Sequence, residues 1–247
     1  MSQTDLVCAP ARTEEGVGGV AAVVQRYERA RTERDMRGLS ALQAPIYHHK
    51  HLLRGAVAAT RDGAMLADAP IRSLSQVQMC FEQLAIARLD DWGQGLSSLV
   101  FLLRDERGAW RIAGEAAGSA LGRQVRFNPD LPASSVLETL AAYYAAVRDG
   151  DPETIARIFD DSWHMKNHED GRMVCEGKAA FIERIKPGPL PGYDDDRQIA
   201  DVQIINGELA YVRVDKPSTP STTVFTFFHV NERWLITDKV WADGRVR

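Results

Sequence analysis

The sequence lacks several features that would define its function directly. No charge of one sign predominates, since 30 basic residues stand against 34 acidic ones and the formal net charge is -4 at pH 7. This balance gives no reason to expect nucleic acid or an anionic membrane as a partner. Uninterrupted apolar runs such as residues 99–103 are too short to cross a bilayer. We therefore expect neither nucleic acid nor a membrane among the partners.

Cysteine is scarce and follows no paired pattern. Cys8, Cys80 and Cys175 are odd in number and include no C-x-x-C spacing, which is typical of reduced thiols in a reducing compartment. Residues 1–16 also lack the basic and then apolar stretches of a secretory signal. The sequence therefore predicts a cytoplasmic protein.

Motifs that hold cofactors are missing as well. The chain has no glycine-rich phosphate loop and no nucleophile elbow. The acidic run 194–196 lacks the Gly and Glu that complete a calcium-binding EF-hand loop, and we interpret it as a solvated loop. We expect no cofactor.

What the sequence does contain is an internal repeat. Residues 136–171 match residues 20–55 at a constant shift of 116 (136 − 20), without a gap. The matched positions include Tyr27 and Tyr143, Asp35 and Asp151, His48 and His164, and Lys50 and Lys166. A duplicated unit predicts a duplicated architecture.

The repeat continues at a slightly larger shift. Residues 201–215 match residues 76–90 at a shift of 125 (201 − 76). The extra residues fit the Pro- and Gly-rich segment 186–195, where insertions cost little. In the second copy, Asn206-Gly207 between alternating runs predicts a β-hairpin.

The hydrophobic pattern gives each copy the same elements. We expect a helix, a short helix, a strand, a possible further helix and a four-strand antiparallel meander, which is an α+β unit with helices on one face of a curved sheet. The predicted organisation is a flexible arm 1–16, a first domain 17–117, a linker 118–134 and a second domain 135–247. Ser135 and Glu138 also predict a capping box at the start of the second domain.

Two stretches of the second copy carry a family resemblance. They are YYAAVRDGDPETIARIFDD, residues 143–161, and RWLITDKVW, residues 233–241. Together they resemble the nuclear-transport-factor-2-like superfamily, also called SnoaL-like or cystatin-like, and are similar to its lumazine-binding branch. The first copy joins through the repeat. It departs from the pattern at residues 48–51, His-His-Lys-His, and at Gly114, where the second copy has Asp238.

The resemblance implies two tandem cone-shaped α+β barrels, each a curved sheet around a pocket. Single-copy members of the superfamily commonly dimerise with their sheets face to face, so the two copies are expected to form an internal pseudo-dimer, with a homo-oligomer left open. The superfamily includes isomerase-like, dehydratase-like and cyclase-like enzymes and members without known activity. The fold alone therefore does not fix the reaction.

The strand after the short helix holds the first candidate site residues. Side chains alternate along a strand, so Tyr47, His49 and His51 share one face and His48 and Lys50 share the other. Imidazoles placed inside the cone are suited to general acid or base catalysis near neutral pH. The alternative is a surface strand that is rich in histidine. His49 and His51 lack a convincing third ligand, and we expect no metal.

The second copy predicts which face is internal. Its Trp163, Met165 and Asn167 correspond to Tyr47, His49 and His51. Because Trp163 and Met165 are apolar, we expect this face to line the cone and His164 and Lys166 to lie on the outer face.

Asp238 is the second candidate. Strict alternation places Trp234, Ile236, Asp238 and Val240 on one face, and a carboxylate on an apolar face is costly unless it is paired or used. Inside the cone it would be a general base. The alternative is an ion pair at the sheet edge with Arg233, Arg213 or Lys239.

These residues lead to one functional hypothesis and one alternative. The hypothesis is a cofactor-independent lyase, dehydratase or isomerase that transfers a proton on a small, largely apolar aromatic or polycyclic molecule. The candidate catalytic residues are His49, His51, Asp238 and His164, and the candidate ligand-binding residues are Tyr47, Tyr144, Trp163 and Asn167. The alternative is a non-catalytic small-molecule-binding or accessory protein in which these aromatics are plain core.

Overall fold

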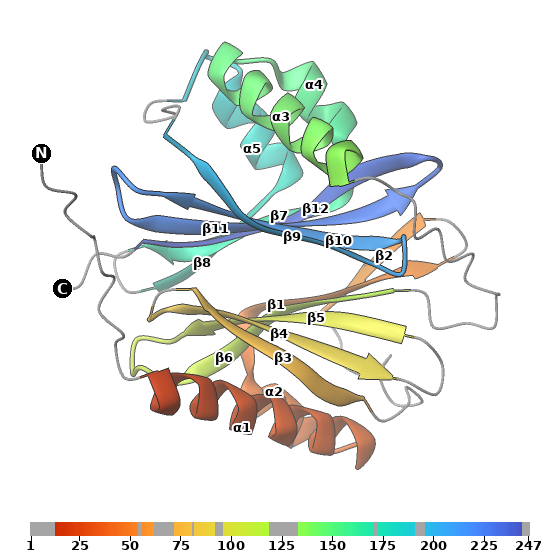
Figure 1. Ribbon diagram of the computed structural model, residues 1–247, viewed down its shortest axis with the longest axis vertical. Helices are drawn as coiled ribbons and strands as arrows, with labels where there is room; N and C mark the ends of the chain where they lie inside the picture. The colour runs from red at the N-terminus through yellow and green to blue at the C-terminus, as the bar shows by residue number, and fades with distance from the viewer. Residues whose placement is uncertain are drawn as a thin grey trace, which may run out of the picture.

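Four layers make up the molecule, in the order helices, sheet, sheet, helices (Figure 1). The computed structural model describes residues 13–53, 56–61, 72–80, 82–91, 96–118, 133–169, 172–190 and 196–243. Most of the predicted arm and linker lie outside these residues, but the first helix already begins at Thr13, inside the predicted arm. Within the described residues, no helix is both long and apolar enough to cross a membrane.

The described part of the first domain has two helices on the outer face of its sheet. They are α1 (Thr13–Thr32) and α2 (Met36–Leu42). The strands are β1 (Gln43–Leu53), β2 (Ala56–Thr60), β3 (Ser73–Cys80), β4 (Leu84–Asp91), β5 (Leu96–Arg104) and β6 (Trp110–Ala117).

The second domain repeats this plan with one more described helix. The helices are α3 (Ala133–Asp149), α4 (Pro152–Ile158) and α5 (Lys178–Ile185). The strands are β7 (Phe159–Glu169), β8 (Arg172–Gly177), β9 (Gln198–Ile205), β10 (Leu209–Lys216), β11 (Ser221–Val230) and β12 (Arg233–Asp243). The predicted hairpin is confirmed, because β9 and β10 pair in antiparallel fashion around Asn206 and Gly207, both of which have positive φ.

The two sheets have the same strand order. The first runs β2-β1-β6-β5-β4-β3 and the second β8-β7-β12-β11-β10-β9, with β1 parallel to β6 and β7 parallel to β12. The predicted α+β class and the tandem arrangement are therefore confirmed. The sequence analysis missed the edge strands β2 and β8, which are short and contain no strict apolar alternation.

Equivalent caps begin the short helices of the two domains. The Asp35 carboxylate accepts a hydrogen bond from Gly38 N, and the Asp151 carboxylate accepts from Glu153 N and Thr154 N. Such caps satisfy amide groups that the first helical turn leaves without partners. The predicted capping box at Ser135 is wrong, because α3 already begins at Ala133. Ser135 Oγ instead accepts a hydrogen bond from Trp234 Nε1.

Three apolar clusters account for the layers. One lies between the helices and sheet of the first domain and includes Val24, Tyr27 and Leu102. A second fills the same place in the second domain. The third joins the two domains, because Phe101 of β5 and Phe228 of β11 belong to one cluster of buried side chains. The sheets thus pack face to face, as the resemblance implied.

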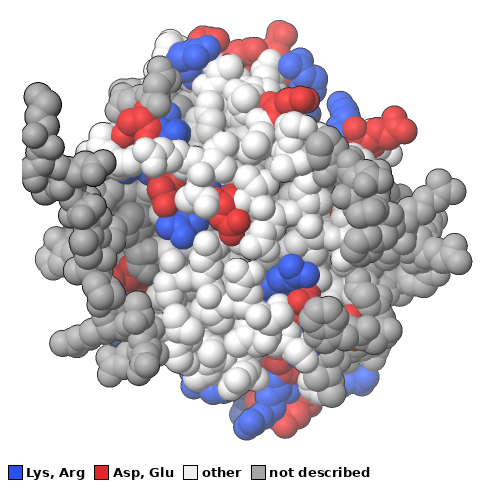
Figure 2. All heavy atoms as spheres, viewed as in Figure 1, with Lys and Arg blue, Asp and Glu red and all other residues white. Residues whose placement is uncertain are grey.

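The visible surface carries charges of both signs. On the face seen in Figure 2, basic and acidic side chains lie in mixed groups separated by uncharged surface. No extended field of one sign is visible among the described residues on this face.

Candidate functional site

The first candidate site lies inside the cone of the first domain. Strand β1 turns Tyr47 and His49 toward the helices, where Tyr47 joins the apolar cluster under α1. His49 Nδ1 lies 3.7 Å from Glu115 Oε2 of β6, which is ion-pair range but too long for a hydrogen bond. The His51 ring lies 5.3 Å from the His49 ring, between centroids. Tyr47 and His49 of β1 therefore lie on the helix side of the sheet.

Glu115 is the centre of a buried polar network. Its Oε2 accepts a hydrogen bond of 2.8 Å from the Tyr27 hydroxyl, which lies 2.9 Å from the Tyr47 hydroxyl. Its Oε1 accepts a charge-assisted hydrogen bond from Arg72, which also forms an ion pair with Glu28 of α1. A buried carboxylate is tolerated when it is paired and hydrogen-bonded in this way.

These contacts fix the charge of the network. Burial acts to raise the pKa of Glu115, but the Arg72 guanidinium and the nearby His49 outweigh it and hold this pKa well below its usual value. Burial, with the charge of Glu115, raises the pKa of Tyr27 well above its usual value. Burial and His49 lower the pKa of His51. The cone therefore holds an ionised carboxylate, neutral tyrosines and a His51 ring that favours its neutral form.

Sequence reasoning missed Glu115, Arg72 and Tyr27 as site residues. Glu115 is fully covered on a strand whose other residues are mostly apolar, and this was the available signal. Arg72 precedes β3 outside any pattern, so only the folded chain brings it to Glu115.

The second cone is filled mainly by aromatic side chains. Trp163 is buried and stacks on Phe159 with ring centroids 4.1 Å apart. Lys239 is the counterpart of Glu115 at a shift of 124, and its Nζ donates a hydrogen bond of 3.1 Å to the Tyr143 hydroxyl. The same position therefore holds an acidic residue, Glu115, in the first cone and a basic residue, Lys239, in the second.

The remaining candidate ligand-binding residues occupy the same cone. Tyr144 is half-buried, with the Arg197 guanidinium 4.9 Å from its ring centroid. Asn167 is buried, and its Nδ2 lies 3.5 Å from the His168 carbonyl oxygen. Neither residue is near His49, so the predicted residues do not form one site.

A second polar cluster lies between the two sheets. The His48 and His164 rings stack with their centroids 3.8 Å apart, and so the two copies of the H-x-K motif meet across the interface. Lys50 Nζ donates a 2.8 Å hydrogen bond to Asp238 Oδ2, and Lys166 Nζ lies 3.1 Å from Asp238 Oδ1. The predicted outer-face position of these histidines and lysines is confirmed.

The predicted position of Asp238 inside the cone is wrong. The pairing of β11 with β12 passes from Thr226 opposite Asp238 to Phe227 opposite Ile236, so Thr237 is an extra residue in a β-bulge. A bulge reverses the alternation of side chains beyond it. Asp238 therefore faces the first domain, and its partners are Lys50 and Lys166 rather than Arg233, Arg213 or Lys239.

The interface cluster shifts the pKa values of its members. Burial, assisted by Lys166, lowers the pKa of His48 to about 3. Burial and Lys50 lower the pKa of His164 to about 4. Burial also lowers the pKa of Lys50 to about 8 against the opposing effect of Asp238. The pKa of Asp238 stays below its usual value because the two lysines outweigh burial.

A hollow of about 300 Å³ lies elsewhere, on the outside of the second domain. Its lining is Ala156, Arg157, Phe159, Asp160, Asp161, Lys178, Arg233 and Leu235. Lys178 Nζ already donates to the Phe159 carbonyl oxygen and to Asp161. None of the predicted site residues lines this hollow, and we assign it no role.

Comparison with known proteins identifies the fold. Residues 132–242 match the model of a protein family described as "Putative lumazine-binding". Among curated proteins, none matches this chain. The second domain is therefore similar to that family, and the first domain has the same strand order with its helices also on the outer face.

Several solved structures are similar to this chain at low sequence identity. Two nuclear-transport-factor-2-like proteins of unknown function, from Silicibacter pomeroyi DSS-3 and Methylobacillus flagellatus KT, are 21% and 19% identical to this chain. The match to the Silicibacter protein covers 44% of this chain and 93% of that protein. The match to the Methylobacillus protein covers 49% of this chain and 98% of that protein. The TM-score is 0.39 in both cases. A ketosteroid isomerase-like protein from Erwinia carotovora atroseptica SCRI1043 is 14% identical, covers 47% of this chain and 99% of its own, and has a TM-score of 0.38.

Proposed function

We propose that the first cone binds a small, largely apolar organic molecule and transfers a proton on it, as a cofactor-independent lyase, dehydratase or isomerase. The observation that carries this proposal is the buried His49–Glu115 pair, with 3.7 Å between Nδ1 and Oε2. A carboxylate beside an imidazole orients the ring and stabilises the imidazolium that forms when the ring takes a proton.

Each residue of the cone has a distinct role in this proposal. His49 removes the proton from the substrate, and Glu115 stabilises the charge that His49 acquires. Tyr27 and Arg72 keep Glu115 ionised and fixed through their hydrogen bonds. His51, half-buried beside His49, receives that proton from the His49 imidazolium and delivers it to the product or to the leaving group, so both rings end the turnover neutral.

The predicted roles of Asp238 and His164 change. Both lie between the sheets, where Asp238 contacts two lysines and His164 stacks on His48. In this proposal they hold the two domains together and touch no substrate.

The test uses the whole chain and a set of ring compounds. Binding is measured by titration, and each compound that binds is assayed for loss of water, elimination or a double-bond shift. His49→Gln and Glu115→Gln should each lower kcat roughly 100-fold or more while binding is retained, because general base catalysis contributes about that much. His229→Gln, which alters a histidine of β11 in the second domain, is the control. Full turnover by His49→Gln would reject the assignment.

The second candidate function is binding without catalysis, in the second cone. It is favoured by Tyr144 beneath the Arg197 guanidinium and by Lys239 at 5.6 Å from the Tyr143 ring centroid, because cations over aromatic rings suit a flat, electron-rich ligand. Lumazine is a direct probe, since the second domain matches the family described above. Quenching of lumazine fluorescence that Tyr144→Ala abolishes and His49→Gln does not would support this candidate over the first.

A further inference from the structure

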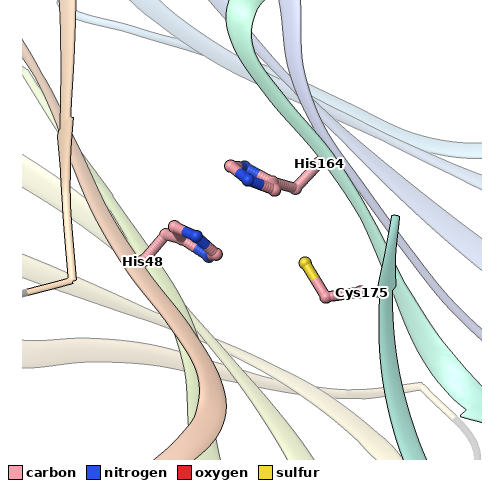
Figure 3. A group of neighbouring side chains, drawn as sticks. All are labelled: His48, His164 and Cys175. Atoms are coloured by element: carbon pink, nitrogen blue, oxygen red, sulfur yellow. The ribbon is translucent and has the colours of Figure 1, made fainter. Parts of the chain in front are cut away.

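Three side chains with metal-binding chemistry converge between the two domains. His48 comes from β1, His164 from β7 and Cys175 from β8, and one donor atom of each lies within 4.8 Å of the others. Figure 3 shows the two rings and the sulfur directed toward a common space between the strands. The group spans both domains, so it exists only when the sheets are packed together.

Duplication alone does not account for this group, because one of its three residues differs between the two copies. His48 and His164 are counterparts, but the counterpart of Cys175 is Ala59 (175 − 116). The counterpart of Gly177, which pairs with His164, is Arg61, which contacts His48. The second copy thus supplies a sulfur where the first has a methyl group.

The His48 ring is already oriented as a ligand. Its Nδ1 lies 3.0 Å from the Ile46 carbonyl oxygen, so Nδ1 carries the proton and donates it. Nε2 is then the lone-pair nitrogen, and it accepts a 3.1 Å hydrogen bond from Arg61 Nε. Metal-ligating histidines usually donate their second nitrogen to a backbone carbonyl or carboxylate in this manner.

The donor set and its surroundings select the ion. The thiolate is a soft ligand that selects Cu(I) or Zn(II), and imidazole nitrogens suit both ions. The nearby charges are Lys50, Lys166 and Arg61 against Asp238, so three cations face one carboxylate. When Cys175 binds as a thiolate, a monovalent ion leaves the net charge unchanged, whereas a divalent ion adds one positive charge in a poorly solvated place.

We propose that His48, His164 and Cys175 form an interdomain site for Cu(I). On binding, the thiol proton of Cys175 leaves to solvent, a Cu–S bond forms, and the two histidines donate nitrogen lone pairs without any change of oxidation state. Arg61 gives up its hydrogen bond to His48, and the stacked rings separate to point at the ion. The bound ion joins the first domain to the second through three ligands.

The experiment is a Cu(I) titration of the full chain under anaerobic conditions, in competition with a chromophoric Cu(I) chelator. We expect one ion per chain, with Cys175 protected from alkylation when the ion is bound. Cys175→Ala, which restores the residue found in the first copy, and His164→Asn should each weaken binding roughly 10-fold to 100-fold or more. His229→Gln should bind as the wild type does, and circular dichroism shows whether each variant is folded.

A gain-of-affinity variant keeps the test independent of misfolding. Arg61→Ala removes both the competing hydrogen bond and one positive charge, so Cu(I) should bind roughly tenfold more tightly. Unchanged affinity in Cys175→Ala, or weaker binding in Arg61→Ala, would overturn the site. Zn(II) that displaces Cu(I) at equal concentration would overturn the choice of ion.

Discussion

Lys166 of the second domain occupies the space above Gly114 of the first. A Cβ atom built on Gly114 would lie only 2.7 Å from Lys166 Nζ. Gly114 is the counterpart of Asp238 at a shift of 124, so the first domain has no carboxylate where the second has one. Lys166 therefore shares Asp238 with Lys50, and the duplicated interface has one acid for two lysines.

The first prediction concerns the crowding at Gly114. Gly114→Ala should destabilise the protein by about 1–3 kcal/mol, because the new methyl group pushes the buried Lys166 ammonium away from Asp238. Gly114→Asp should cost less than Gly114→Ala, since its carboxylate can pair with the displaced lysine. Urea unfolding of the two variants measures the difference. A greater loss with Asp than with Ala would contradict this account of the interface.

The second prediction concerns the acid itself. Asp238→Ala should destabilise the protein by about 3–5 kcal/mol, because it leaves two buried ammonium groups without a counter-charge. Asp161→Ala removes an equally close ion pair with Lys178, but the Asp161 side chain is fully exposed, and no measurable change is expected. Lys166→Met should cost less than Asp238→Ala, since Lys50 still pairs with the acid. Equal losses in all three variants would argue against a buried triad.

His49 and Asp238 show where the alternation of side chains along a strand predicts the correct face and where it does not. Both positions were assigned to a face by counting alternate residues. The count holds for β1, whose pairing with β6 is regular from His48 to His51. It fails in β12 because of the bulge at Thr237, and the first domain has the same bulge at Ala113. Nothing in the local sequence marks an extra residue of this kind.

The rest of the candidate site depends on contacts between distant segments. Tyr27 and Glu115 are 88 positions apart, and Arg72 and Glu115 are 43 apart. The tandem fold could be predicted because the repeat is visible in the sequence itself. The partner of a buried charge could not, because it depends on how the helices and the sheet pack. The H-x-K motif was a partial exception, since its recurrence indicated a shared outer face before the interface was known.

The third prediction is a loss of stability in mild acid. The pKa of His48 is lowered from 6.5 to about 3 and that of His164 to about 4. Between pH 6.5 and 4 the unfolded chain therefore holds protons on these rings that the native state does not, so the free energy of unfolding falls as the pH falls through this window. Above pH 6.5 the two histidines contribute no pH dependence.

Urea unfolding at several pH values between 7 and 4.5 gives the free energy of unfolding, and its slope against pH gives the number of protons that the chain takes up on unfolding. His164→Gln should reduce that number by close to one and flatten the profile, whereas His229→Gln is the matched control. The lowered pKa values of Glu115 and Asp238 add to this loss only toward the acid end of the range, where the same carboxyl groups begin to take up protons in the unfolded chain. Stability that is constant or rises on acidification would show that the interface accommodates charged histidines.

The fourth prediction separates the two domains. Expressed alone, the second domain, residues 133–243, should form a homodimer through the apolar face that includes Leu209 and Phe228. In such a dimer each Lys166 can pair with the other copy's Asp238, so acids and lysines balance. The first domain alone would bring two Lys50 side chains together with glycine at both acid positions, and it should dimerise more weakly.

Sedimentation equilibrium measures both dissociation constants. Asp238→Gly in the isolated second domain reproduces the first-domain arrangement and should weaken its dimer, and a first-domain dimer as tight as that of the second would show that apolar packing alone determines the assembly.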